Sequence, residues 1–415
     1  MADYFIINGG KKLEGEVSIG NAKNASLKIL AASILAREPI KIPNLPQIED
    51  VNRMKELLLD LGAKFRSESL NSTQIKKTDL NYKIADRFRA SIVLTGPILA
   101  RYGRVSFPHP GGCTLGKRPI NFFIDGFKAL GARVQKTGQI FTVSSKKLIG
   151  EKFVFPNVSV TGTENMIMAA TLAKGKTILK NSACEPEIEN LAAFLNSLGA
   201  KISGAGTPTL EIEGVETLSG GTWNGMPDRI EAGTFIILAA ATRSRLKIKN
   251  CNPGHLDVLL TLLKNTGVNF EIGNDYVIVA PSKKLKAIDI KTREYPGFAT
   301  DFQAPLTVLL TQSKGISLVH ETIYDGRLFY TDILNQMGAD IIMADPHRVI
   351  VRGPSKLHGK KIHSPDIRAG MALIIAALIA KGESIIDNVY QIDRGYEKID
   401  ERLRAFGADI KRIKT

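Results

Sequence analysis

Two kinds of apolar stretch alternate along the chain. The first is apolar nearly all round and leads through a short turn into a run of β-branched residues, as in residues 31–45, 168–182, 236–250 and 373–388. A helix without a polar face has to be buried, so we expect interior helices here, each followed by a strand. The second kind has polar residues between its leucines, which predicts helices with one face in water.

The second kind of helix ends in a phrase that recurs through the chain: a glycine, then Ala or Val, a polar residue and an apolar one. The glycine stands at positions 62, 131, 199, 267, 338 and 407, with spacings of 69, 68, 68, 71 and 69. Such a glycine predicts a helix end with positive φ, followed at once by a strand. The spacing predicts six copies of one unit of about 69 residues.

Each unit is therefore expected to hold helix, strand, helix and strand, with the buried helices inside and the sheets outside. A count of six permits two groups of three. A solenoid, in which every unit contacts only its neighbours, is the alternative, although common solenoid repeats are shorter, at about 20–50 residues.

Polar clusters precede the buried helices. They lie at Lys23 and Asn24, at Arg89, at Glu164 and Asn165, at Asp228 to Glu231, at Asp301 and Gln303, and at Asp366 and Arg368. Ordinary helix capping accounts equally well for Glu164, Asn165 and Asp366. A cation at a helix start opposes the helix dipole, so Lys23, Arg89 and Arg368 indicate an anion bound between side chain and helix.

Residues 109–123 form the most irregular segment, with Cys113 in a Gly- and Pro-rich loop ahead of Lys117 and Arg118. A thiol near two cations is expected to have a lowered pKa and to be reactive. Cys184 and Cys251 follow strand-like runs without such neighbours, and we expect both to be structural.

Composition narrows the classes of protein. The chain has 415 residues, 44% hydrophobic and 23% charged, and its longest apolar run, 371–380, is half the roughly 20 residues that a membrane span needs. Three distant cysteines without a CxxC pair predict no disulfide framework and no sequence-local zinc site. These features predict a globular, cytoplasmic protein without a membrane span.

The formal net charge of +15 favours anionic partners, which include nucleic acid, a membrane surface and phosphorylated metabolites. The basic residues are spread along the whole chain, and only nine Tyr and one Trp are available for base stacking. We therefore expect no nucleic-acid partner.

Six motifs give the chain a resemblance to a known family. They are GNAKNA (20–25), RAS (89–91), GGCTLGKRP (111–119), PDRIEAGTF (227–235), TDFQA (300–304) and IDRGYE (392–397). Together they resemble the UDP-N-acetylglucosamine 1-carboxyvinyltransferase family. The resemblance implies an α/β fold of two inside-out, barrel-like domains, each made of three repeats. Residues 21–227 would form the domain with the Cys113 loop, and residues 1–20 with 228–415 the domain that completes the active-site cleft.

The activity implied by the resemblance is transfer of the enolpyruvyl group of phosphoenolpyruvate to the 3-hydroxyl of UDP-N-acetylglucosamine. The reaction releases phosphate by addition and elimination through a tetrahedral ketal, and it is the first committed step of peptidoglycan synthesis. The partners implied are these two small-molecule substrates, and no cofactor or metal is expected.

The resemblance also implies residue roles. Asp301 resembles the general base that takes the proton of the sugar hydroxyl, and Cys113 the general acid toward the enolpyruvyl methylene carbon, with a covalent adduct as a further possibility. Phosphoenolpyruvate would be held by Lys23, Asn24, Arg118, Arg327, Arg368 and Arg394, of which Lys23 and Arg394 also count as catalytic. The UDP-sugar pocket would consist of Arg89, Arg118, Pro119, Ile120, Asn121, Phe122, Ser159, Val160, Thr161, Gly162, Asp301 and Ile323, with Asn24 beside them.

The chain departs from the family pattern where many members have Asp-Leu-His, here Asn121, Phe122 and Phe123, and where some have lysine, here Asn157. One alternative is a 5-enolpyruvylshikimate-3-phosphate synthase-like transferase, although the Lys-Ser pair usual there is absent, since Lys23 is followed by Asn24. An alternative from another class is a basic repeat protein that binds RNA or anionic lipid.

Overall fold

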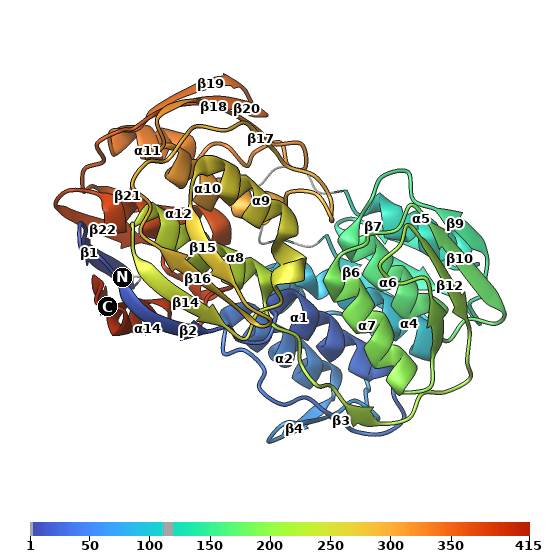
Figure 1. Ribbon diagram of the computed structural model, residues 1–415. Helices are drawn as coiled ribbons and strands as arrows, with labels where there is room; N and C mark the ends of the chain where they lie inside the picture. Colours follow the sequence, from blue (N-terminus) through green and yellow to red (C-terminus); the bar gives the residue numbers. More distant parts are fainter. Residues whose placement is uncertain (1–2, 110, 112–118) are drawn as a thin grey trace. The chain divides into compact units, whose positions relative to one another are not determined.

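The chain folds into two compact units that are both mixed α and β. The computed structural model describes residues 3–109, 111 and 119–415. One unit, the split unit, combines the N-terminal residues up to Gly20 with Pro227–Thr415, and the other, the continuous unit, contains the described residues between Asn21 and Met226. Figure 1 shows both. No helix in the described ranges is long and apolar enough to cross a membrane.

The continuous unit contains seven α-helices among its described residues. They are α1 (Lys23–Ala32), α2 (Glu49–Leu61), α3 (Tyr82–Ala85), α4 (Thr95–Tyr102), α5 (Asn121–Ala129), α6 (Val160–Ala170) and α7 (Pro186–Ser197), with the 3-10 helices η1 (Ser33–Leu35) and η2 (Arg89–Leu94). Its strands are β3 (Ile40–Lys41), β4 (Lys64–Arg66), β5 (Ser69–Asn71), β6 (Arg104–Pro108), β7 (Arg133–Thr137), β8 (Ile140–Ser144), β9 (Lys152–Val154), β10 (Lys176–Lys180), β11 (Lys201–Ser203), β12 (Thr209–Glu213) and β13 (Gly221–Thr222).

The split unit takes its first two strands from the N-terminus. Its helices are α8 (Arg229–Ala241), α9 (Asp257–Thr266), α10 (Gln303–Leu310), α11 (Thr331–Gln336), α12 (Ile367–Ile379), α13 (Tyr390–Asp393), α14 (Ile399–Ala405), η3 (Pro253–Leu256) and η4 (Thr300–Phe302). Its strands are β1 (Tyr4–Asn8), β2 (Glu14–Ser18), β14 (Arg245–Lys249), β15 (Asn269–Ile272), β16 (Tyr276–Ala280), β17 (Ile290–Lys291), β18 (Gly315–His320), β19 (Asp340–Asp345), β20 (Arg348–Gly353), β21 (Lys361–His363), β22 (Glu383–Asp387) and β23 (Asp409–Ile413).

The strands of the described residues form six separate sheets, three in each unit. Five are four-stranded and follow one order: β13-β3-β5-β4, β9-β10-β12-β11, β2-β14-β16-β15, β17-β18-β20-β19 and β21-β22-β1-β23. In each, the first pair is parallel and the other two pairs are antiparallel. The sixth sheet has three strands, β6-β8-β7. The mixed α/β class is confirmed, and every sheet in the described residues is open, so no hydrogen-bonded barrel closes among them.

The apolar helices are interior, as their sequence predicts. All 13 residues of α8 are buried, and in Figure 1 the helices α8, α10 and α12 lie among the strands of their unit. These three helices contact one another, and each also contacts a strand of a different sheet, β14, β18 or β22. Apolar residues on every side of such a helix remove the most apolar surface from water when helices and sheets surround it.

The recurring glycines end helices in the left-handed conformation, as predicted. All six glycines of the repeated phrase, at positions 62, 131, 199, 267, 338 and 407, have positive φ, between 88° and 109°. A Cβ would strain this conformation, so glycine allows the chain to turn at once from helix into strand.

Candidate active site

Asp301 lies between two buried arginines in the split unit. Its Oδ1 accepts a hydrogen bond from Nη2 of Arg327 at 3.1 Å, and its Oδ2 accepts from Nε of Arg368 at 3.0 Å with Nη2 of Arg368 at 2.9 Å. The Arg327 and Arg368 side chains are 4% and 8% exposed, whereas that of Asp301 is 23% exposed. The carboxylate is therefore the part of this cluster most open to other molecules.

The two arginines set the charge state of Asp301. Burial alone would raise the pKa of the carboxyl group, but the positive charges of Arg368, Arg327 and Arg229 outweigh burial and hold its pKa well below the usual range. In return, although burial favours neutral guanidines, Asp301 raises the pKa of both Arg327 and Arg368. With the guanidinium groups in this position, Asp301 is ionised at neutral pH and is a weak base.

Local structure fixes the position of Arg368 in this cluster. Asp366 caps α12 by accepting from the backbone N–H groups of Arg368 and Ala369 at 2.8 and 3.1 Å. Nη1 of Arg368 also donates to the hydroxyl of buried Tyr396 at 3.2 Å. The capping explanation is correct for Asp366, and the cap places Arg368 on the first turn of the helix.

Glu321 connects the cluster to the segment that carries Ile323. Glu321 is fully buried, and its two oxygens accept from Thr300 at 2.8 Å and from the backbone N–H of Ile323 at 2.8 Å. Thr300 is the residue before Asp301, so one carboxylate holds two segments that contain predicted site residues. Sequence reasoning missed Glu321, because a single acid after a strand carries no recognisable signal.

Arg394 lies at the end of α13 in the same unit and is 7% exposed. Its Nη1 donates to Oε1 of Gln391 at 2.9 Å. The neighbouring Asp393 binds Arg412 through two hydrogen bonds of 2.6 and 2.8 Å. The acid next to Arg394 in the sequence is thus engaged by Arg412.

Lys23 and Asn24 begin α1 in the continuous unit. The Nζ of Lys23 lies 2.8 Å from Oδ2 of Asp50, and the two side chains are only 10% and 4% exposed. Asp50 belongs to the first turn of α2, so the cation at the start of α1 has a carboxylate on a neighbouring helix. Asn24 is half-buried. Asp50 did not stand out in the sequence, because an acid in the first turn of a helix is common there.

Helix α6 begins at the predicted UDP-sugar segment. The hydroxyl of Ser159 caps the helix by accepting from the backbone N–H of Gly162 at 3.1 Å. Ser159, Val160 and Thr161 are half-buried and Gly162 is buried. Arg89, at the start of η2, is half-buried, and η2 packs against both α1 and α6.

Capping does not account for Glu164 and Asn165, which lie inside α6. The carbonyl oxygen of the Asn165 side chain accepts from the hydroxyl of Thr95 and from the backbone N–H of Gly96, both at 3.0 Å, which joins α6 to α4. Glu164 is fully buried opposite Lys28 of α1 at 3.4 Å.

The segment around Pro119 leads into α5. Pro119 is exposed, Ile120 is buried just before the helix, Asn121 is exposed and Phe122 is half-buried. Cys113 and Arg118, two of the predicted site residues, lie outside the described residues. The other cysteines fit structural roles: burial raises the pKa of the Cys251 thiol to about 11, and burial together with nearby acids raises that of Cys184.

The predicted residues thus divide between the two units. The split unit brings Asp301, Arg327 and Arg368 into direct contact and also holds Ile323 and Arg394, and the continuous unit holds Lys23, Asn24, Arg89, Pro119 to Phe122 and Ser159 to Gly162. No group of three or more His, Cys, Asp or Glu in the described part of the chain is placed to hold a metal ion. The geometry suits binding of anions and proton transfer at Asp301.

Comparisons with known proteins identify similar enolpyruvyl transferases along the whole chain. The family model for EPSP synthase (3-phosphoshikimate 1-carboxyvinyltransferase) matches residues 7–403. UDP-N-acetylglucosamine 1-carboxyvinyltransferase from Coxiella burnetii is 42% identical over 100% of this chain and 96% of its own length. The protein of the same name from Desulforapulum autotrophicum is 43% identical over 99% of this chain and 100% of its own length.

Solved structures share the fold. The enolpyruvyl transferase NikO from Streptomyces tendae aligns with a TM-score of 0.87 at 22% identity and covers 100% of both chains. EPSP synthase from Acinetobacter baumannii aligns with a TM-score of 0.74 at 18% identity and covers 99% of this chain and 100% of its own. At these identities the structures speak for the fold alone.

Proposed function

We propose that this chain transfers the enolpyruvyl group of phosphoenolpyruvate to the 3-hydroxyl of UDP-N-acetylglucosamine and releases phosphate. The proposal starts from the family, since the chain belongs to the UDP-N-acetylglucosamine 1-carboxyvinyltransferase family. This transferase reaction is the first committed step of peptidoglycan synthesis. The observation in the structure that carries the proposal is the carboxylate of Asp301 held between two buried guanidinium groups.

The chemistry requires a base at the sugar and an acid at the enolpyruvyl group. In our mechanism Asp301 takes the proton of the sugar 3-hydroxyl while the oxygen of that hydroxyl attacks carbon 2 of phosphoenolpyruvate. Cys113 delivers a proton to carbon 3. The product of this addition is a tetrahedral ketal. Loss of a proton from carbon 3 with departure of phosphate then restores the double bond and completes the transfer.

The arginine pair explains how a weakly basic carboxylate becomes a base at the right moment. An anionic substrate group that attracts Arg327 and Arg368 weakens their hold on Asp301 and so raises its pKa. Binding of phosphoenolpyruvate would then activate the base, and Asp301 would stay protected by its ion pairs until that substrate arrives. The same guanidinium groups would stabilise the carboxylate of phosphoenolpyruvate.

The remaining residue roles belong to the proposal as well. Lys23, Arg118 and Arg394, with Asn24, would hold the phosphate group, and Lys23 would leave Asp50 or share it with the substrate. Arg89, Arg118 to Phe122, Ser159 to Gly162 and Ile323 would line the UDP-sugar pocket. We further propose that the protein works in the cytoplasm without cofactor, metal or nucleic acid.

We infer that the chain consists of six copies of one unit, three in a domain of residues 21–227 and three in a domain of residues 1–20 and 228–415. The common strand order of five sheets and the left-handed glycines at a spacing of about 69 residues support this inference. In it, the buried helices lie inside and the sheets outside, which is the sense in which the domains are inside-out.

The proposed function is tested by measuring phosphate release. An enzyme of this kind releases phosphate from phosphoenolpyruvate only when UDP-N-acetylglucosamine is also present, and shikimate 3-phosphate serves as the control acceptor. Phosphate release with shikimate 3-phosphate but not with UDP-N-acetylglucosamine would assign the chain to the 5-enolpyruvylshikimate-3-phosphate synthase chemistry instead. Absence of release with either acceptor would contradict the proposal.

A further inference from the structure

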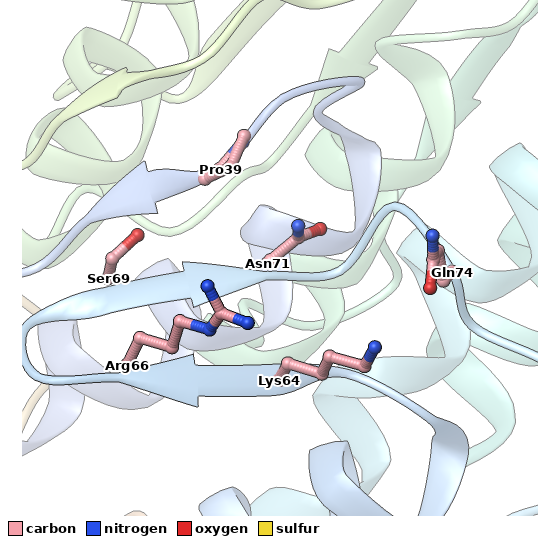
Figure 2. A pocket seen from close by; sticks show the side chains of 6 residues that line it. All are labelled: Pro39, Lys64, Arg66, Ser69, Asn71 and Gln74. Atoms are coloured by element: carbon pink, nitrogen blue, oxygen red, sulfur yellow. The ribbon is translucent and has the colours of Figure 1, made fainter.

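A small pocket lies on the outer face of the first sheet of the continuous unit. It is about 240 Å³ in volume and is lined by Pro39, Lys64, Arg66, Ser69, Asn71 and Gln74. Figure 2 shows these side chains on β4, on β5, on the residue before β3 and, for Gln74, in the loop after β5. None of them belongs to the active site proposed above.

The strand register places the polar side chains on one face. Lys64 pairs with Asn71 and Arg66 pairs with Ser69 across the antiparallel β4 and β5. On the other side of β5, Ser69 pairs with Lys41 of β3. Directly paired residues point to the same face of a sheet, and residues two apart on a strand do so as well. Three cations therefore surround Ser69 and Asn71 on this face.

These cations are not balanced by acids in the way that those of a neighbouring sheet are. In the sheet β9-β10-β12-β11, Lys176 and Lys201 lie 2.7 and 3.5 Å from Glu211 and Glu213. Within the described residues, no ion pair joins Lys41, Lys64 or Arg66 to a carboxylate, and the lining contains no acid.

Two acids close by in the sequence are engaged by the backbone. Glu68 accepts from the N–H of Asn44 at 3.4 Å, and Glu38 accepts from the N–H of Gly220 at 3.2 Å. Neither carboxylate is paired with a cation of the pocket in the described residues.

Asn71 presents a hydrogen-bond donor next to this charge. Its side-chain oxygen accepts from the backbone N–H of Thr73 at 3.0 Å and from the hydroxyl of Thr73 at 2.7 Å. This orientation leaves the amide nitrogen of Asn71 to donate, alongside the hydroxyl of Ser69. Donors that sit between cations match an oxygen-rich anion.

Charged residues on an edge strand also discourage pairing with other chains, and β4 is an edge strand. Protection of the edge explains Lys64 and Arg66. It does not explain the pocket or the hydrogen-bond donors of Ser69 and Asn71 on the central strand β5. We propose that this pocket binds the phosphoryl group of a small phosphorylated metabolite, at a site separate from the active site. Its volume is below the roughly 300–1,000 Å³ of pockets that enclose a drug-sized ligand, so it fits a phosphoryl head group.

Arg66 supplies the planar fork that binds two phosphate oxygens, and Lys64 adds a mobile point charge. The substitutions Lys64→Ala and Arg66→Ala together should remove most of the binding. Both side chains are exposed on a short strand, so the double variant is expected to fold.

The test is calorimetric titration of the full chain with inorganic pyrophosphate. We expect the double variant to lose one binding event or to weaken it at least about tenfold, the usual scale for two charge-assisted contacts. Lys201→Ala, which removes an exposed lysine from the corresponding edge strand of the sheet β9-β10-β12-β11, should change neither the titration nor the turnover.

Turnover without added pyrophosphate should be the same in the double variant as in the wild type, which separates this site from the active site. A titration unchanged by the double substitution would overturn the proposal, as would no binding to the wild type. An equal loss in Lys201→Ala would overturn it too, because the effect would then come from overall charge.

Discussion

Glu164→Gln is expected to change how the stability of the continuous unit depends on pH. Glu164 is fully buried in α6, and Lys28 is its nearest cation, 3.4 Å from Oε1. Neither oxygen of Glu164 has a hydrogen-bond partner among the described residues. Burial raises its pKa to about 7, Lys28 opposes that rise, and Glu187 and Glu185 add to it.

The sign and size of the effect follow from the pKa difference. The unfolded chain releases the proton of Glu164 near pH 4.5 and the folded chain near pH 7. Between these values the folded state binds more protons, so stability falls as the pH rises. At about 1.4 kcal/mol for each pH unit, the full titration lowers the free energy of unfolding by about 3 kcal/mol, most of it between pH 5 and 8.

Glutamine does not titrate, so the stability of the variant relative to wild type should rise by about 2–3 kcal/mol from pH 5 to pH 8. At pH 5 Glu164 of the wild type is itself mostly protonated, so glutamine removes the negative charge beside Lys28 only at the higher pH. The double variant Lys28→Met/Glu164→Gln removes both charges and shows how much of the difference depends on Lys28.

The assay is urea unfolding followed by tryptophan fluorescence at several pH values. The chain has one Trp, Trp223, which is buried in the same unit as Glu164, so its signal reports on that unit. Glu211→Gln, an exposed acid of the same unit, is the control and should show no such slope. Parallel stability curves for Glu164→Gln and wild type, or a difference that grows toward low pH, would refute the reasoning.

Three further predictions concern the proposed reaction. Asp301→Asn should lower turnover, measured by phosphate release, by about 100-fold or more, and unchanged turnover would exclude Asp301 as the base. The same variant should be less stable than wild type at pH 7 but not in acid. The reason is that the lowered pKa of Asp301 stabilises the fold only at pH values above the ordinary pKa of 3.8. Arg118→Ala and Arg394→Ala should each weaken phosphoenolpyruvate binding by roughly 10- to 150-fold and UDP-sugar binding less, and equal weakening of both in binding titrations would argue for a role in conformation. A small anionic epoxide should alkylate Cys113, and peptide mapping should find no adduct on Cys184 or Cys251. Cys113→Asp should prevent alkylation and keep much of the activity, whereas Cys113→Ala should lose both alkylation and activity. Full turnover in Cys113→Ala would contradict the general-acid role.

The sequence by itself determined the local structure and the family. A helix without a polar face can only be stable in an interior, and a glycine after a helix permits the left-handed turn, so burial of α8 and positive φ at Gly62 both follow from short stretches of chain. The motifs that resemble the family are also short, and the full-length comparisons bear out the family that they indicated.

Tertiary structure alone decided which side chains meet. Asp301 contacts Arg327 and Arg368 across 26 and 67 residues of sequence, and Lys23 contacts Asp50 from another helix. Strand pairing is equally remote, since Phe5 of β1 lies beside Ile386 of β22. Periodicity reports which face of an element is buried, but the neighbour on that face depends on how elements distant in sequence pack together. Whether Glu164 and Asn165 cap a helix stayed open in the sequence for the same reason, because their partners, Lys28 and Thr95, lie on helices distant in sequence.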